Sequence, residues 1–250
     1  MHVNAVAYNA DIDQIALSSP HFSEIWIIDH GTTTEEARGH TGGRWGKGGD
    51  ILYRWGNPRA YHSGSDADRR LFFQHNIQWI SKGMPGEGHL LVFNNGNGRK
   101  PEQYSSVDEF IPPTNDDGNY VRPAHKPFGP EKALWSYTAP NPKDFFAWFV
   151  SGAERLTNGN TLINSGAVGV VFEVTPQNEI VWKFANPFKR LGRDAPSRAG
   201  NMLFRFNRYA LDHPAFAGRS LVPGKTLVEI EEEFDRQKAQ ADPATKVAAP

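Results

Sequence analysis

The sequence predicts an all-β chain built from repeated four-stranded sheets, the arrangement of a β-propeller. Turn-forming residues are frequent, with 24 Gly and 18 Pro among 250 residues, and few stretches have the periodicity of a helix. An aliphatic and aromatic element that ends in proline also occurs three times, as LYRWGNP from Leu52, LWSYTAP from Leu134 and VWKFANP from Val181. A supersecondary unit repeated along a chain is typical of propellers and other repeat folds.

The strands follow from short runs rich in β-branched and aromatic residues, separated by turn signals. The turns include Asn95-Gly96, Asp117-Gly118 and Asn158-Gly159. The expected strands are Ile15 to Leu17, Glu24 to Ile28, Ile51 to Trp55, Leu90 to Phe93, Val107 to Ile111, Leu134 to Tyr137, Thr161 to Ile163, Val170 to Val174 and Ile180 to Phe184.

Each aromatic element closes a longer unit. A hairpin precedes it, and a short segment precedes the hairpin: HVNAVAY from His2, QHNIQWI from Gln74 and SGAERL from Ser151. Four strands per unit, with the aromatic residues on the outermost strand, describe one propeller blade. The stretch MLFRFNRYALDHPAF from Met202 is expected to supply the innermost strand of an incomplete fourth blade.

Three to four blades are too few to close a ring, since propellers usually have 4 to 8. We therefore expect residues 1–225 to form a partial β-propeller, the C-terminal part of a longer one. Residues 226–250 are expected to form a tail, helical from Leu227 to Lys238 and then disordered from Ala239 onward. The alternative is a complete small β-sandwich made of the same strands.

Composition excludes several classes of function. With 27 basic and 28 acidic residues the net charge is -1, which argues against nucleic acid as a partner. No apolar run is long enough for a membrane span, and no signal peptide follows Met1. The absence of cysteine excludes disulfides and thiolate metal sites, and no HxH or HExxH motif predicts a metal. Nothing in the sequence predicts an oligomeric state.

The first strand of a propeller blade lines the central channel, so polar residues at its beginning converge. These are His2 and Asn4 in the first unit, His75 and Asn76 in the second, and Ser151 with Arg155 in the third. Imidazoles, carboxamides and a guanidinium would make an anion-binding pocket with a nucleophile at neutral pH. The alternative is structural: His75 as a hydrogen-bonded interior histidine, the asparagines as strand-entry residues bonded to their own backbone, and Arg155 paired with the neighbours of Glu154.

Several motifs, taken together and in order, resemble the bacterial arylsulfate sulfotransferases. They cover most of residues 2–187, and agreement continues more weakly through FRFNRYALDHPAF from Phe204. The motifs are HVNAVAYN, GGDILYRWGNP, QHNIQWI with GHLLVFNNGN, YSSVDEF, and SGAERLTNGNTLI with FEVTPQNEIVWKFANP.

The resemblance implies a six-bladed propeller that transfers a sulfuryl group from an aryl sulfate to a phenol, through a sulfated histidine and without a nucleotide sulfate or other cofactor. The family's nucleophile falls on His75, and its His-x-Asn motif falls on His2 and Asn4, which would contact the sulfate. His2 would then protonate the leaving oxygen, and Ser151 and Arg155 are further substrate-binding candidates. The family is commonly exported, which implies a periplasmic or secreted location.

One departure from the family affects the sulfate site. The family often has an arginine after the serine pair of the first hairpin, whereas here Ser18 and Ser19 are followed by Pro20 and His21. His21, Arg155 or another basic residue would have to replace the missing bidentate donor. The second functional hypothesis is therefore a non-catalytic propeller, a binding module whose channel site has lost its activity.

Overall fold

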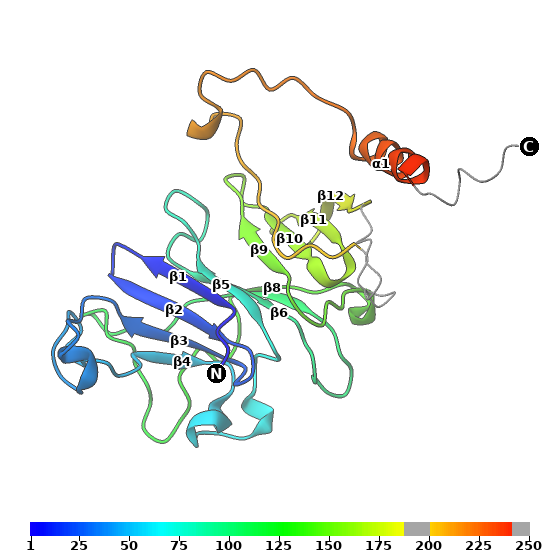
Figure 1. Ribbon diagram of the computed structural model, residues 1–250. Helices are drawn as coiled ribbons and strands as arrows, with labels where there is room; N and C mark the ends of the chain where they lie inside the picture. Colours follow the sequence, from blue (N-terminus) through cyan, green and yellow to red (C-terminus); the bar gives the residue numbers. More distant parts are fainter. Residues whose placement is uncertain (188–200, 242–250) are drawn as a thin grey trace, which may run out of the picture.

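The computed structural model describes residues 1–187 and 201–241. Over these ranges the chain forms three four-stranded antiparallel sheets and one α-helix (Figure 1). The predicted all-β class is confirmed. Each sheet contains four strands that are consecutive in the sequence and pair in that order, so each is a meander.

The first sheet consists of β1 (Ala5–Asn9), β2 (Gln14–Ser19), β3 (Glu24–Asp29) and β4 (Tyr53–Trp55). Tight turns join its first three strands, with Asp13 and Ser23 in the left-handed region at φ 52° and 55°. One face carries Ala16, Ile25 and Ile27, all fully buried against the second sheet.

The second sheet consists of β5 (His75–Trp79), β6 (Leu90–Asn94), β7 (Ser106–Phe110) and β8 (Trp135–Tyr137). All five residues of β6 are buried because its sheet lies between the other two. Leu90 and Val92 pack into the cluster shared with the first sheet, and Leu91 and Phe93 into the cluster shared with the third. Burial on both faces explains why this strand is a continuous apolar run.

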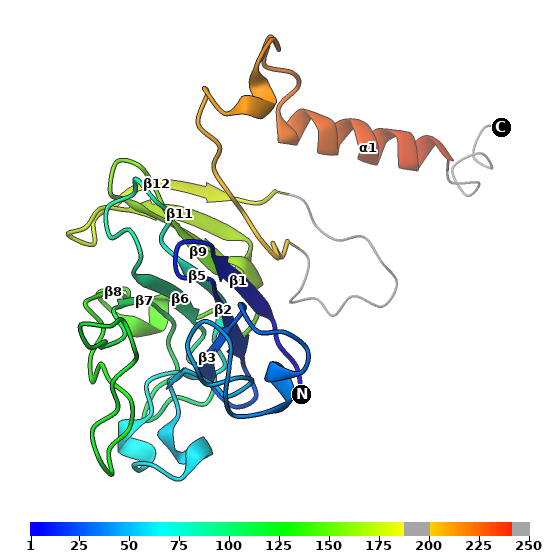
Figure 2. The same cartoon turned by 90° about the vertical axis from the view of Figure 1, so that its left-hand side faces the viewer.

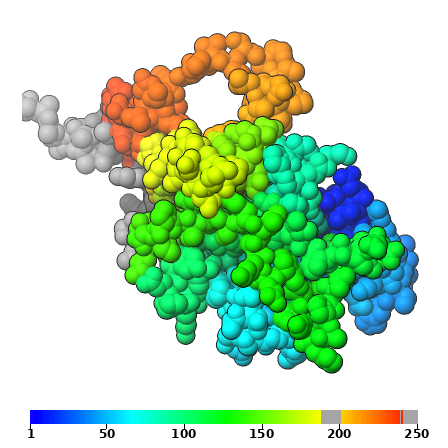
Figure 3. Space-filling model, turned by 180° about the vertical axis from the view of Figure 1, so that it is seen from behind, coloured from blue at the N-terminus to red at the C-terminus, as the bar shows by residue number. Residues whose placement is uncertain are grey.

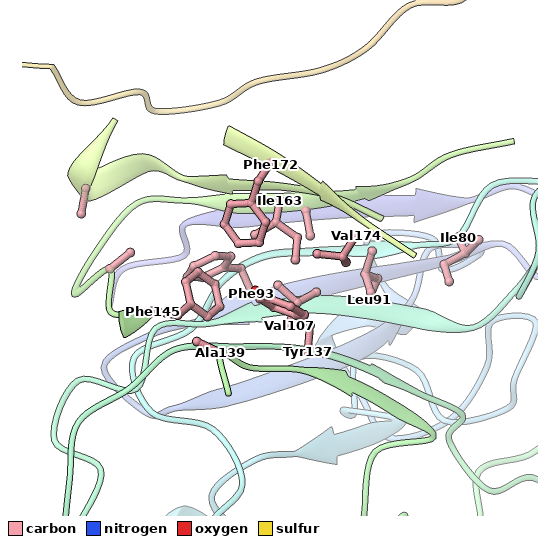
Figure 4. Packing of buried hydrophobic residues seen from close by; sticks show 13 residues of the cluster. Ile80, Leu91, Phe93, Val107, Tyr137, Ala139, Phe145, Ile163, Phe172 and Val174 are labelled. Carbon is pink, nitrogen blue, oxygen red and sulfur yellow. The ribbon is translucent and has the colours of Figure 1, made fainter. Parts of the chain in front are cut away.

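The third sheet consists of β9 (Gly152–Arg155), β10 (Thr161–Ser165), β11 (Val170–Val174) and β12 (Ile180–Ala185). Figure 4 shows its Ile163, Phe172 and Val174 facing Phe93 and Tyr137 of the second sheet. Ring centroids of Tyr137 and Phe172 are 5.4 Å apart. Aromatic residues of this kind add about 0.5–1.5 kcal/mol per pair beyond their buried area.

The repeated aromatic elements lie on the outermost strands β4, β8 and β12, as expected. Rings of the first two elements pack between neighbouring sheets: Trp55 of β4 stacks on Phe110 of β7 with centroids 4.0 Å apart, and Tyr137 of β8 packs on Phe172 of β11. In the third element Trp182 of β12 is 39% exposed and contacts Phe206 instead.

The expected innermost strand after Met202 is not a β-strand, which corrects that expectation. The segment instead runs extended over the outer face of the third sheet. The Leu203 amide donates to the Gly166 carbonyl at 2.9 Å, and Leu203 and Phe206 cover Leu162. Side chains hold the segment as well: Asn164 donates to the Leu203 carbonyl, and Arg208 pairs with Glu173. No consecutive ladder of backbone hydrogen bonds forms there among the described residues.

Helical elements are short apart from one. Single 3-10 turns span Glu36–Arg38, Pro58–Tyr61, Asp66–Asp68, Pro142–Asp144, Gly166–Val168 and Pro214–Phe216. The tail helix α1 spans Leu227–Ala241, so it extends past the predicted end at Lys238 into residues expected to be disordered. Thr226 and Glu229 exchange side-chain hydrogen bonds with each other's backbone amides and cap its beginning. The rest of the predicted disorder lies outside the described residues.

The segment from about residue 210 to α1 stands away from the sheets, as Figure 3 shows in orange and red. The first strands of the three sheets, in contrast, come together: β1 contacts β5, and β5 contacts β9 (Figure 2). Among the described residues the sheets do not close into a ring, and the far face of β1 leaves Val6 and Tyr8 65% and 54% exposed.

Candidate functional site

A polar cavity of about 170 Å³ lies where the three first strands meet. Four segments line it: residues 4–7, residues 75–78, residues 150–153 and residues 204–207. Three of these segments begin the strands whose polar residues are expected from the sequence to converge, and the fourth lies where a further innermost strand is expected.

His75 begins β5 in the wall of this cavity and is only 9% exposed. Its ring atom Nδ1 lies 2.8 Å from Oδ1 of Asn95. The pairing of β5 with β6 shifts register between His75 and Gln78, and Asn76 in between has a φ of 55°. Such bulges redirect side chains and occur often next to functional sites.

Burial lowers the pKa of His75 below its ordinary value, because a charged imidazole loses hydration in this environment. Hydrogen bonding to Asn95 and to the Phe73 carbonyl acts in the opposite direction, and the nearby charge of His2 lowers the pKa further. The lowered pKa favours the neutral form of the ring at neutral pH.

His2 is exposed and lies at the rim rather than in the lining of the cavity. A row of rings connects it to His75, with centroid separations of 6.1 Å from His2 to His21, 5.2 Å from His21 to Phe73 and 6.4 Å from Phe73 to His75. His2 and His75 thus come from neighbouring sheets and are linked through two intervening rings, but only His75 lines the cavity. His21, which follows the proline at the missing arginine's position, belongs to the same row.

Asn4 lines the cavity and is held by its side-chain amide, which donates to the Gln74 carbonyl at 2.8 Å. Its Oδ1 is buried without a hydrogen-bond partner among the described residues. Because Oδ1 accepts and does not donate, only the second N–H of the carboxamide is suited to a sulfate oxygen.

Ser151 also lines the cavity, but its hydroxyl is already engaged. It donates to the Phe149 carbonyl at 3.2 Å and accepts from the Gly166 amide at 3.0 Å. Ser151 and the β-branched Val150 before it have φ values of 83° and 47°. Strained backbone of this kind costs of order 1–3 kcal/mol per residue and clusters at functional sites.

Asn76 and Gly152 fit closely together on this wall. Oδ1 of Asn76 accepts from the Ala153 amide at 2.9 Å, and a Cβ on Gly152 would lie 2.5 Å from that oxygen. Gly152 therefore permits the close approach of β5 and β9. Asn76 has a cross-sheet bonding role, which differs from the bonding to its own backbone that the sequence offers as the structural alternative.

Arg155, expected among the substrate-binding residues, does not line this cavity. Its guanidinium lies 2.5 Å from Glu109 and stands over the ring of Trp135 at 5.5 Å. Both charged side chains are buried, at 9% and 5% exposed, and His89 approaches the other oxygen of Glu109 at 2.6 Å. The observed geometry is that of an ion pair between the second and third sheets.

Two residues at the site are missing from the sequence-based predictions. Arg205 is the only lysine or arginine among the described residues that line the cavity, and it is exposed. The sequence pattern that could have indicated Arg205 is the alternation of apolar and polar residues in FRFNRY, which lies where the next innermost strand is expected. Asn95, the hydrogen-bond partner of His75, is part of the Asn95-Gly96 turn signal, and this turn explains the residue in the sequence without any other role. No cluster of three potential metal ligands occurs among the residues that the structure describes.

Comparison with solved structures gives distant matches only. A Bacteroides caccae protein of unknown function is 14% identical, with a TM-score of 0.37, over 74% of this chain and 46% of its own. Kluyvelomyces marxianus Hsv2 is 11% identical, with a TM-score of 0.34, over 73% of this chain and 49% of its own. The chain thus spans about half the length of these structures.

The search of curated proteins found no match. No helix in the described ranges is long and apolar enough to cross a membrane. The family model described as Arylsulfotransferase (ASST) matches residues 1–187, which include all three sheets and three of the four segments that line the cavity. The chain belongs to the arylsulfotransferase family.

Proposed function

We propose that the three sheets are blades of a propeller and that the cavity is part of its channel. The meander order, the contact between first strands and the aromatic packing between sheets support this arrangement. The segment at residues 204–207 then occupies the place of the next innermost strand.

Within this channel the protein transfers a sulfuryl group from an aryl sulfate to a phenol, and His75 carries the group between them. The supporting observation is the buried imidazole of His75, whose pKa is lowered, in the wall of a polar cavity that is also lined by the guanidinium of Arg205. A neutral imidazole is a competent nucleophile, and a covalent intermediate divides one difficult displacement into two easier ones.

In the first step a ring nitrogen of His75 forms a bond to sulfur as the sulfur–oxygen bond to the aryl group breaks. The electron pair leaves with the phenolate oxygen, which takes a proton from the charged form of His2. In the second step an acceptor phenol gives its proton to His2, its oxygen bonds to sulfur, and the nitrogen–sulfur bond breaks to regenerate His75. Atoms and charge balance over the cycle.

Negative charge develops on the sulfuryl and leaving oxygens during both steps, so the site needs fixed donors. Arg205 is the cation suited to this work, and it comes from a different segment than the arginine absent at Pro20. Asn4 contributes its free N–H. An aligned donor of this kind is worth roughly 2.7–4 kcal/mol in comparable oxyanion sites.

The second candidate is a binding module without catalysis, favoured by Pro20 at the clamp position and by the exposure of His2. The two candidates differ in chemistry. Incubation with p-nitrophenyl sulfate and an acceptor phenol releases nitrophenol and leaves a sulfated peptide containing residue 75 if the transferase proposal is correct.

His75→Ala abolishes both signals on that proposal. The matched control is His40→Ala, because His40 is 85% exposed in an outer loop and should leave both signals unchanged. Nitrophenol release that survives His75→Ala excludes the histidine route. Binding of the aryl sulfate without any turnover favours the binding module.

A further inference from the structure

Asn95 follows β6 and is completely buried behind His75. Its position is tightly fixed by the turn that comes next. Gly96 has a φ of 77°, and a Cβ at this position would lie 1.7 Å from the Tyr104 carbonyl oxygen. The Asn95 carbonyl also accepts from the Ser105 hydroxyl at 2.8 Å. The carboxamide is therefore presented to its neighbours from a rigid backbone.

The hydrogen bonds of Asn95 determine which way its carboxamide faces. Nδ2 lies 2.7 Å from the carbonyl oxygen of Ala147 and 3.1 Å from that of Val150. Carbonyl oxygens only accept, so the nitrogen must be on their side. Oδ1 is then the atom directed at the imidazole of His75, at 2.8 Å from Nδ1.

An amide oxygen cannot donate, so the ring nitrogen that contacts it must carry the hydrogen. A neutral imidazole has a single N–H, for which the Phe73 carbonyl is a second acceptor. Asn95 is the acceptor at 2.8 Å from Nδ1, and with the hydrogen on that atom the lone pair lies on Nε2. We propose that Asn95 is a positioning residue that holds His75 in the Nδ1–H tautomer and so assigns Nε2 as the nucleophilic atom.

This inference rests on the proposed function for its chemical meaning. During transfer Nε2 bonds to sulfur, the aryl oxygen leaves with the electron pair, and the hydrogen on Nδ1 stays in place. The ring then carries a positive charge beside the sulfonate, and Oδ1 of Asn95 still accepts from Nδ1–H. A neutral acceptor orients the ring without the charge attraction of a carboxylate, which would raise the pKa of the free ring and favour its protonated, non-nucleophilic form.

Asn95 also ties His75 to the neighbouring segment of the cavity lining at residues 150–153. The Val150 carbonyl that it binds belongs to the strained pair just before β9, where φ is 47° and 83° at Val150 and Ser151. One carboxamide thus fixes both the orientation of the imidazole and the segment that presents Ser151.

The direct test is the nitrogen NMR spectrum of His75 in the full chain, with ¹⁵N-labelled histidine and assignment by comparison with His75→Gln. We expect the wild-type ring to be in the Nδ1–H form at neutral pH. Observation of the Nε2–H form overturns the inference, and this measurement requires neither a variant of Asn95 nor any activity.

The variant test compares Asn95→Ala with Asn164→Ala. Asn164 is an equally buried asparagine that donates to the Leu203 carbonyl and does not contact His75. Asn95→Ala should release the tautomer and lower kcat by about 100-fold or more with little change in KM, as expected for loss of an orienting partner. Asn164→Ala should leave the tautomer unchanged.

The outcomes separate this inference from the proposed function. The Nδ1–H form in a protein that transfers no sulfuryl group refutes the function and leaves the tautomer assignment intact. Full activity in Asn95→Ala with the ring released refutes the positioning role while the transferase proposal stands. If Asn95→Ala does not fold, the wild-type spectrum still decides the assignment.

Discussion

Replacement of Arg155 tests whether this residue stabilises the fold or binds substrate. The variant Arg155→Met keeps the long side chain next to Trp135 but removes the charge that pairs with Glu109. Glu109 is 5% exposed, so its carboxylate would remain buried without its strongest partner. Breaking a buried pair from one side typically costs 3–5 kcal/mol.

The expected cost here is at the lower end of that range, about 3 kcal/mol. His89 lies 2.6 Å from the other Glu109 oxygen, so the carboxylate keeps one hydrogen-bonding partner. Glu109→Gln should cost about as much, because it leaves the guanidinium buried. The double variant should cost only about 1–2 kcal/mol, since no uncompensated charge remains.

Urea unfolding of the wild type, the two single variants and the double variant measures this cycle. The single costs exceed the double cost, so the coupling energy should be about 4 kcal/mol. The KM for aryl sulfate should be unchanged in folded Arg155→Met. An unaltered free energy of unfolding together with a raised KM would refute the structural role and indicate that Arg155 binds the substrate.

Three further predictions concern the cavity. The pKa of His75 is lowered, so kcat/KM should stay constant as the pH is lowered to about 6.5, the ordinary pKa of histidine, and decrease only below that pH. Below the same pH, residue 75 binds a proton more readily in the unfolded chain than in the folded protein. The free energy of unfolding should therefore decrease as the pH is lowered, and it should decrease less steeply in His75→Gln. Gly152→Ala should cost about 1–3 kcal/mol in urea unfolding, because the new Cβ would lie 2.5 Å from Oδ1 of Asn76; a neutral effect would contradict this close approach. Arg205→Ala should raise the KM for aryl sulfate at least tenfold and leave Tm unchanged, since the side chain is exposed; an unaltered KM would exclude it from the sulfate site.

Much of the fold follows from local sequence, because turns and repeats are local. The aromatic elements at Leu52, Leu134 and Val181 predict the outermost strands and their packing. The segment after Met202 shows the limit of such reasoning. Its alternation resembles a strand, yet a strand requires a partner ladder, and only the Leu203 amide and a few side chains make contacts there.

The candidate site is less predictable, because its properties depend on partners far along the chain. Arg155 and Glu109 are separated by 46 positions, and nothing in the local spacing indicates that they pair. The beginnings of the strands correctly place Asn4, His75 and Ser151 at one cavity. The lowered pKa of His75 comes from burial, which is a property of the packed sheets.

The contacts between β5 and β9 have a mechanical consequence. Asn76 and Gln78 of β5 bond to the amide and the carbonyl of Ala153, so side chains substitute for the backbone pairing that two separate sheets lack. These polar clamps set the spacing of the innermost strands independently of the apolar clusters further out. Substitutions in the outer core should therefore lower the stability of the protein while the cavity keeps its width, so that stability and cavity geometry change separately.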